Sequence, residues 1–268
     1  MKGRILIVAG SDSGGGAGIQ ADIKTVTALG GYAMTAITAL TAQNTEGVAA
    51  IHDVSIDFVS HQMTVVLDDI GADIIKTGML HSSDVINTVC DALADRNIGM
   101  VVDPVMVAKG GASLLQSEAV ATLKSRLVPM ARVLTPNVPE AEVLSGIIID
   151  DEAAAHRAAE LLWKMGAKAV LMKGGHMTDA ASAETVTDLL FENGVLVEAF
   201  KSPRIDTRHT HGTGCTTASA IATGLAQGLS VRDAVARARA YVQEAIRTAP
   251  GYGRGHGPLN HGHTVEKF

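Results

Sequence analysis

Aromatic side chains, cysteines and positive charge are all scarce in this sequence. Only 3% of the 268 residues are aromatic although 47% are hydrophobic, so the core must be built from Ala, Val, Ile, Leu and Met. Such side chains suit close packing of helices on a sheet. The two cysteines, Cys90 and Cys215, are far apart in the sequence and lack the spacing of a metal site.

The charge and the short apolar runs exclude several classes of partner. The formal net charge is −6, which argues against a surface for nucleic acids or anionic membranes. No apolar run approaches the length of a transmembrane helix, and the run at residues 5–10 is too short for a signal peptide. We therefore expect a cytoplasmic protein that acts on a small molecule, with neither nucleic acid nor membrane as partner.

Short apolar runs alternate with amphipathic segments along the chain. The runs predicted to be buried strands include 5–9, 33–40, 73–76, 100–102, 132–134 and 169–172, with helices between them. Late in the chain, Asn193-Gly194 predicts a hairpin that adds antiparallel strands. With about six or seven parallel strands and no linker, residues 1–268 are expected to form one three-layer α/β/α sandwich with a mostly parallel sheet. The Gly- and His-rich end from Pro250 is interpreted as a frayed polar tail.

A glycine-rich loop, residues 10–18, follows the first predicted strand and precedes a helix. It lacks the Gly-Lys-Ser/Thr of a P-loop, and its glycines do not have the spacing of a dinucleotide-binding loop. We interpret it as a loop that lets a small ligand approach the backbone, with Asp12 and Asp22 as candidate polar contacts. Either aspartate could instead serve only in a turn or face solvent.

Polar side chains follow several of the predicted strands. Asp103 and Lys173 come directly after buried strands, at the edge where open parallel sheets place their ligands, and a lysine there can pair with phosphate. Asn137 and Glu140 have the spacing of a capping box at a helix start. Alternatively, both face the ligand side and hold a hydrated magnesium ion, and spacing alone does not decide between these two interpretations.

The stretch 209–218 is rich in small and hydroxylated residues and runs into a helix. Gly212 and Gly214 expose backbone N–H groups at that helix N-terminus, which is a favourable place for an anion. A thiol at the same position is expected to have a lowered pKa, so Cys215 could be a base or a nucleophile. The alternative is that the stretch is only a capped helix start.

With these motifs the chain resembles the ribokinase-like superfamily, and within it the hydroxymethylpyrimidine/phosphomethylpyrimidine kinases of thiamine biosynthesis. The likeness is carried, in order, by residues 9–22, Thr41-Ala42-Gln43-Asn44-Thr45, Asp103-Pro104-Val105-Met106, Thr135-Pro136-Asn137-Val138-Pro139-Glu140 and His211-Gly212-Thr213-Gly214-Cys215. The segment at 9–22 is the most specific of them. The resemblance covers nearly the whole chain up to the tail.

The resemblance implies ATP- and Mg²⁺-dependent phosphorylation of 4-amino-5-hydroxymethyl-2-methylpyrimidine and of its monophosphate, by a homodimer. The roles it implies for individual residues fall into three groups. The backbone amides of Gly212, Thr213, Gly214 and Cys215 would hold the phosphoryl group; Gln43, Gly10, Asp22 and Met79 would bind the pyrimidine; and Lys173, Asp103 and Asn137 would bind ATP, with Glu140 and Asp103 holding Mg²⁺ through water.

Several alternatives stay open at this point. A pyridoxal kinase would perform the same chemistry on another ring, a sugar kinase usually has aspartate in place of Cys215, and a pyrimidine-binding sensor would need no transfer apparatus. The Cys215 side chain could be the general base, or the residue could mainly supply its amide. Residues 108–113 and 176–184, which are small and polar, are expected to be mobile loops near the substrate.

Overall fold

A single β-sheet runs through the computed structural model, which describes residues 1–107, 111, 114–174 and 184–265. In the described part of the chain it has nine strands in the order β3-β2-β1-β4-β5-β6-β7-β8-β9. The strands are β1 (Arg4–Asp12), β2 (Tyr32–Gln43), β3 (Val48–Asp53), β4 (Ile74–Thr77), β5 (Gly99–Val102), β6 (Ala131–Leu134), β7 (Ala169–Met172), β8 (Thr185–Glu192) and β9 (Val195–Pro203).

The central strands are parallel and both edges are antiparallel. Strands β2, β1, β4, β5, β6 and β7 pair in parallel, which agrees with the number predicted. The predicted late hairpin is present as β8 and β9, which pair in antiparallel fashion through the turn at Asn193-Gly194. Strand β3 was not predicted. It pairs antiparallel to β2 at the other edge, and its residues are mostly exposed and lack a hydrophobic period.

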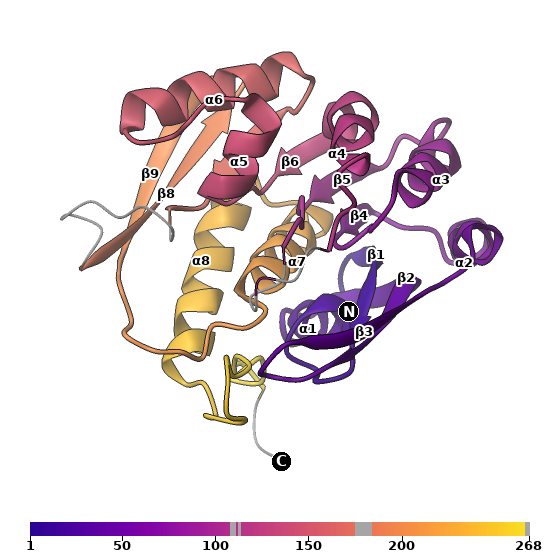
Figure 1. Ribbon diagram of the computed structural model, residues 1–268, viewed down its shortest axis with the longest axis horizontal. Coiled ribbons are helices and arrows are strands. Elements are labelled where there is room, and N and C mark those ends of the chain that lie inside the picture. The colour runs from indigo at the N-terminus through magenta and orange to yellow at the C-terminus, as the bar shows by residue number, and fades with distance from the viewer. Residues whose placement is uncertain (108–110, 112–113, 175–183, 266–268) are drawn as a thin grey trace.

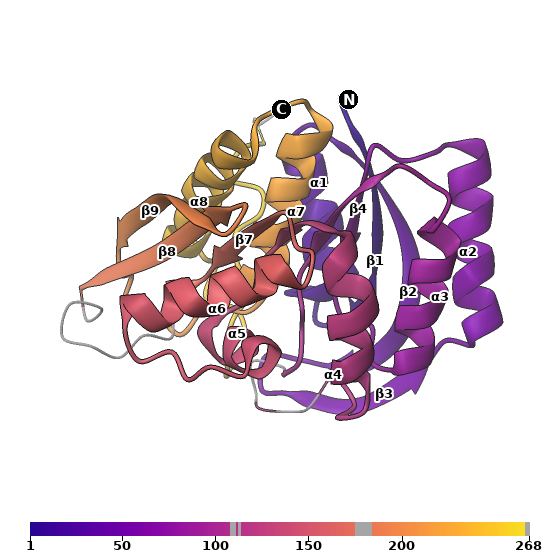
Figure 2. The same ribbon diagram turned by 90° about the horizontal axis from the view of Figure 1, so that it is seen from above.

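Helices cover the sheet on both faces, so the predicted three-layer sandwich is confirmed (Figures 1 and 2). One face carries α1 (Gly18–Ala28), α7 (Thr213–Ala226) and α8 (Val231–Arg247). The other carries α2 (Ile56–Asp69), α3 (Ser83–Leu93), α4 (Ala119–Thr122) continued by η1 (Leu123–Leu127) and η2 (Val128–Met130), α5 (Val138–Ser145) and α6 (Glu152–Lys164). None of the helices in the described ranges is long and apolar enough to cross a membrane.

The position of α7 depends on its small residues. Ten consecutive residues from Thr216 to Leu225 are buried. A Cβ on Gly224 would lie only 2.8 Å from the Cβ of Ala234 in α8, so the two helices approach as closely as side chains allow. This packing holds α7 firmly between α8, α1 and the sheet, with its N-terminus at the carboxyl end of the central strands.

Part of the C-terminal segment, residues 257–261, packs against α7 and α8, which differs from the expectation of a frayed tail from Pro250. Leu259 and His261 are about 95% buried, and the Tyr241 hydroxyl in α8 donates to the His261 carbonyl at 2.7 Å. His261 Nε2 lies 2.9 Å from Thr216 Oγ1 in α7. Burial lowers the pKa of His261 to about 4. The packing of this segment could not be predicted from its low hydrophobicity, because one leucine and a neutral histidine are enough to anchor it.

Candidate active site

The carboxyl ends of the parallel strands form one continuous edge. Backbone hydrogen bonds continue past the strands themselves, from Gly78 N to the Val8 carbonyl at 3.0 Å and from Asp103 N to the Thr77 carbonyl at 3.2 Å. Lys173 N donates to the Pro136 carbonyl at 2.9 Å in the same way. The polar residues that follow neighbouring strands are therefore held in line by the backbone, as open α/β sheets hold their ligand sites.

Asp103 and Lys173 form an ion pair at this edge. Lys173 Nζ lies 3.1 Å from Asp103 Oδ1, and the two side chains are 16% and 3% exposed. The Thr135 hydroxyl donates to the same carboxylate oxygen at 3.3 Å. Burial alone would lower the pKa of Lys173, but Asp103 and Glu140 outweigh it and hold the pKa above its ordinary value. Lys173 is thus a fixed positive charge with one side still open to solvent.

The loop before α7 brings its glycines against this pair. Gly212 is the residue before the helix and has a φ of 86°, and a Cβ there would collide with the Gly16 carbonyl. A Cβ on Gly214 would lie 3.4 Å from Lys173 Nζ and 3.5 Å from Asp103 Oδ2. The N–H groups of the first helical turn have no intrahelical acceptor. The Thr213 N–H donates instead to the Thr210 carbonyl at 3.4 Å, and Gly214 brings the start of the helix beside the Lys173–Asp103 pair.

Asn137 and Glu140 form the capping box at the start of α5. Asn137 Oδ1 accepts from Glu140 N, and Glu140 Oε2 accepts from Asn137 N, both at 2.9 Å. The capping box does not exclude the magnesium interpretation, because Glu140 also lies close enough to Lys173 and Asp103 to interact with their charges. Burial, together with Asp103, raises the pKa of Glu140 to about 7 despite the opposing effect of Lys173. A carboxyl held at such a pKa is destabilised when ionised and would gain from a nearby cation.

The described residues contain no group of three or more His, Cys, Asp or Glu side chains that could hold a metal ion by themselves. Mg²⁺ typically keeps several waters and takes one or two carboxylates together with the phosphates of a nucleotide. Asp103 and Glu140 supply two carboxylates that lie close enough to interact at this edge. These residues therefore fit a hydrated Mg²⁺ shared with a bound nucleotide.

Cys215 differs from the expectation of a lowered pKa. Burial raises the pKa of its thiol to about 12; Asp22 and Asp103 contribute in the same direction, and the Lys76 ammonium opposes them. The hydrogen bond from Gly18 N also favours the thiolate but is the smallest effect. The helix N-terminus was predicted to favour the thiolate, but the loss of water around the sulfur outweighs it. The thiol of the free protein is therefore protonated at neutral pH.

Asp22 belongs to a fully buried ion pair that the sequence did not predict. Both of its carboxylate oxygens lie 2.8 Å from Lys76 Nζ, and the Ser219 hydroxyl donates to Oδ1 at 2.7 Å. Neither Asp22 nor Lys76 has any exposed surface. Asp22 thus has no face open to a ligand, which contradicts its expected contact with the substrate. The sequence signal for this pair is a lysine inside a short buried strand, between Ile75 and Thr77.

Gly10 and Met79 are in direct contact. A Cβ on Gly10 would collide with the Met79 methyl group, so glycine at this position leaves room for the observed conformation of the Met79 side chain over the end of β1. Met79 is buried with Ala39 and Leu114 in a small apolar cluster beside the edge. The structure thus brings together two of the residues predicted to bind a ring, and gives them an apolar surface suited to a ring face.

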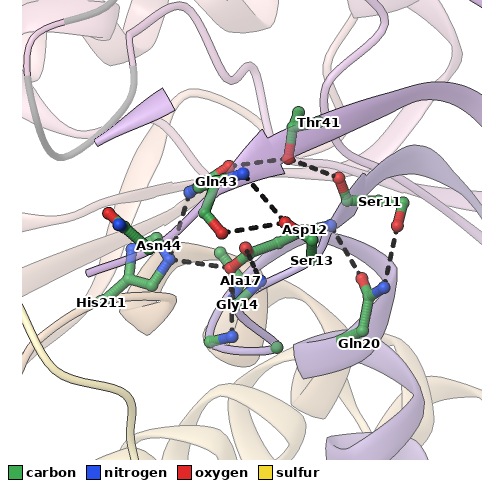
Figure 3. Close-up of polar contacts among 12 residues, drawn as sticks. Ser11, Asp12, Ser13, Gly14, Ala17, Gln20, Thr41, Gln43, Asn44 and His211 are labelled. Carbon is green, nitrogen blue, oxygen red and sulfur yellow. Dashed lines mark hydrogen bonds and ion pairs between the residues drawn. The ribbon is translucent and has the colours of Figure 1, made fainter. Parts of the chain in front are cut away.

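Gln43 lies in a polar network at the end of β2 (Figure 3). Its amide nitrogen is 3.3 Å from His211 Nε2, and its amide oxygen is 3.1 Å from Thr41 Oγ1. His211 Nε2 is also 2.9 Å from Asp12 Oδ2. Asp12 was considered as a polar contact, but its contact with His211 was not predicted, because 199 residues separate the two in the sequence.

Asp12 organises the glycine loop. Its carboxylate accepts backbone hydrogen bonds from Gly14, Gly16 and Ala17 at 2.8 to 3.0 Å. Burial alone would raise the pKa of the Asp12 carboxyl, but the hydrogen bonds from His211 and from the loop backbone hold it below its ordinary value. The carboxylate is therefore ionised, and it links the loop after β1 to the stretch before α7.

The sheet is mostly parallel and lies between two helical layers. At its edge a helix N-terminus, a lysine and two carboxylates meet. This arrangement is typical of small-molecule kinases of the ribokinase-like class. Residues 12–260 match the family described as phosphomethylpyrimidine kinase. The chain belongs to the phosphomethylpyrimidine kinase family.

Individual relatives agree with this assignment. The chain is 48% identical to the hydroxymethylpyrimidine/phosphomethylpyrimidine kinase of Bacillus subtilis, over 96% of this chain and 94% of that protein. It is 54% identical to the thiamine biosynthesis bifunctional protein ThiED of Geobacter sulfurreducens, over 97% of this chain but only 52% of that protein, so it spans about half of the bifunctional relative. A pyridoxal kinase of Bacillus subtilis, solved as an ADP complex, superposes with a TM-score of 0.88 at 32% identity, covering 98% of each chain.

Proposed function

We propose that the protein transfers the γ-phosphoryl group of ATP to the hydroxymethyl oxygen of 4-amino-5-hydroxymethyl-2-methylpyrimidine. A second transfer to the monophosphate would give the pyrophosphate used in thiamine biosynthesis. The observation that carries the proposal is the position of Gly214 against the Lys173–Asp103 pair at the N-terminus of α7. Phosphoryl transfer depends mainly on positioning and charge stabilisation, and this arrangement offers both.

In the proposed reaction the substrate oxygen forms a bond to the γ-phosphorus while the bond from that phosphorus to the bridging oxygen breaks, and ADP leaves. The amides of Gly212, Thr213, Gly214 and Cys215 would donate to the equatorial oxygens as negative charge is redistributed over them. Lys173 would neutralise the ATP phosphates, and Asn137 at the neighbouring strand end would contact the nucleotide. Mg²⁺, held through water by Asp103 and Glu140, would supply further charge neutralisation when it is bound.

The proton of the substrate hydroxyl must pass to a base. Burial raises the pKa of the Cys215 thiol to about 12, so the thiolate is a minor form at neutral pH. We propose that the thiolate is the base and that the Lys76 ammonium, whose charge favours it, stabilises this minor form. The rate would then follow the thiolate fraction.

For the pyrimidine we propose that Gln43 pairs with the aminopyrimidine edge, and that the ring lies against Met79 where Gly10 leaves room for it. A side-chain amide offers one donor and one acceptor side by side, as this edge requires. The apolar cluster around Met79 and the polar network around Gln43 support this division between ring face and ring edge.

A pyridoxal kinase is the second candidate, because solved pyridoxal kinases share this fold closely. Two proteins of the same organism argue for the pyrimidine: this chain is 48% identical to the hydroxymethylpyrimidine kinase of Bacillus subtilis and 32% identical to its pyridoxal kinase. A homodimeric state and a cytoplasmic location stay predictions that rest on the resemblance and the composition. The loops predicted to be mobile, 108–113 and 176–184, lie almost entirely outside the described residues.

The test is ATP consumption by the purified protein with hydroxymethylpyrimidine, its monophosphate, pyridoxal and ribose in parallel reactions. We expect turnover with the first two and little with ribose. Turnover with pyridoxal alone would transfer the assignment to the second candidate, and no turnover with any of the four would reject a kinase of this kind. A Lys173→Met variant, which removes the proposed phosphate contact, serves as the control for contaminating kinases.

A further inference from the structure

The amide of Gln43 is held by a network whose hydrogen bonds determine which way the amide points. The backbone of Gln43 is fixed by Ser13, whose hydroxyl donates to the Gln43 carbonyl and accepts from the Gln43 N–H, both at 2.9 Å. Only the side chain remains to be oriented. One end of its amide lies at His211 and the other at Thr41 (Figure 3).

His211 must donate a hydrogen bond to Asp12. The ionised Asp12 carboxylate can only accept, and it lies 2.9 Å from His211 Nε2. Two lone pairs at that distance would repel each other, so Nε2 must carry a proton. The same nitrogen lies 3.3 Å from the Gln43 amide nitrogen, which is also a donor. Two donors facing each other cannot form a hydrogen bond.

Thr41 leads to the same conflict at the other end of the amide. The Thr41 hydroxyl has one proton, and the Ser11 carbonyl lies 2.8 Å from it, closer than the Gln43 amide oxygen at 3.1 Å. Once that proton is donated to Ser11, the hydroxyl oxygen can only accept. The nitrogen and oxygen ends of an amide have nearly the same shape, so the hydrogen bonds decide which end is which.

We propose that Asp12 and His211 are positioning residues that fix the Gln43 amide with its oxygen toward His211 Nε2 and its nitrogen toward Thr41 Oγ1. No two donors then face each other: the single proton on His211 Nε2 is shared between the Asp12 carboxylate and the Gln43 oxygen, and the Gln43 nitrogen donates to Thr41. One N–H on Nε2 and one lone pair on Oε1 remain free for a ligand, and their positions are fixed. The N–H can donate to a ring nitrogen, and the lone pair can accept from an amine beside that nitrogen.

A fixed amide would make the site selective for rings whose polar edge matches it. This inference rests on the proposed function. A fixed amide makes both hydrogen bonds only with a ring that offers an acceptor opposite Nε2 and a donor opposite Oε1. A ring without an amine beside its nitrogen makes at most one of them and leaves the other group unpaired. Loss of His211 or Thr41 would let the amide rotate and would weaken binding of the aminopyrimidine in particular.

A double-mutant cycle tests whether His211 acts through Gln43. We expect His211→Phe to raise KM for hydroxymethylpyrimidine about 3- to 12-fold, the effect of one or two hydrogen bonds, with little change in KM for ATP. In a protein that already carries Gln43→Ala, His211→Phe should change the pyrimidine KM by less than about twofold, because the group it positions is gone. Equal effects in both backgrounds would overturn the proposal and leave His211 a purely structural role.

Further variants keep the test decisive if His211→Phe does not fold. Thr41→Val removes the acceptor at the other end of the amide without touching Asp12, and should raise the pyrimidine KM in the same non-additive way. His256→Phe, at an exposed histidine whose Nδ1 lies 3.2 Å from the Arg208 carbonyl, is the control and should leave both KM values unchanged.

A readout independent of activity is the nitrogen-15 NMR signal of the His211 ring. It should show a proton on Nε2 in the free wild-type protein, and an unprotonated Nε2 would overturn the orientation proposed here. If the wild type phosphorylates none of the substrates, the proposed function fails, while the NMR result still tests the His211 proton on which the amide orientation depends.

Discussion

The buried carboxyl of Glu140 leads to a prediction that links stability to activity. Its pKa is about 7 in the folded protein, against an ordinary value of 4.5. The folded protein therefore retains a proton on Glu140 between these two values, where the unfolded chain has already lost it. Stability from this group is present below about pH 4.5, declines as the pH rises toward 7 and is lost above it.

The size of the effect follows from the same two values. A difference of about 2.5 pH units corresponds to about 3 kcal/mol. Replacing Glu140 with Gln removes the ionisation but keeps a side chain that can complete the capping box. We expect Glu140→Gln to be more stable than wild type by about 1–3 kcal/mol at pH 8 and nearly equal to it at pH 4.5.

The assay is urea unfolding in the presence of EDTA, at several pH values between 4.5 and 8. Glu152→Gln, at an exposed glutamate in the first turn of α6, is the matched control and should show no such gain. In the kinase assay Glu140→Gln should lose about 10- to 100-fold in activity, as expected for a residue that orients a metal through water. A variant that is less stable than wild type at pH 8 would refute the reasoning.

Two further predictions concern Cys215, at the start of α7, and Lys76, whose charge acts on the Cys215 thiol. Cys215→Ala should lower kcat about 10²–10⁴-fold. The wild-type kcat should rise about tenfold per pH unit from pH 7 to 9, because the thiolate fraction increases with pH. A flat pH profile, together with a variant whose kcat is within a few-fold of wild type, would show that Cys215 contributes only its backbone amide. Lys76→Met should destabilise the fold by about 3–5 kcal/mol in urea unfolding, because it leaves the Asp22 carboxylate buried and unpaired. Adding Asp22→Asn should recover most of that loss, and additive losses would show that the two residues do not act as a pair.

The fold could be predicted from the sequence where hydrophobic runs and turn residues act locally. The parallel strands have continuous apolar runs because both of their faces are covered, and Asn193-Gly194 specifies the late hairpin by its backbone preference alone. Strand β3 could not be predicted in this way. Its residues are mostly exposed, and its conformation follows from pairing with β2.

The convergence of candidate residues at one edge was predictable, but their electrostatics were not. Asp103 and Lys173 lie together as expected because parallel strands align their carboxyl ends, and Gly214 in the first turn of α7 lies beside them. The raised pKa of Cys215, the Asp22–Lys76 pair and the His211–Asp12 contact all depend on burial and on residues distant in sequence. Spacing along the chain carries no information about such contacts. The capping box at Asn137 and Glu140 shows the converse, since a local motif correctly predicted a local structure.

The most direct measurement is the identity of the product formed from ATP and hydroxymethylpyrimidine. Mass spectrometry of the reaction over time should show the pyrimidine gaining one phosphoryl group and then a second, with ADP as the other product. A pyrimidine that stays unmodified while pyridoxal is phosphorylated, or ATP hydrolysis without any phosphorylated ring, would contradict the account.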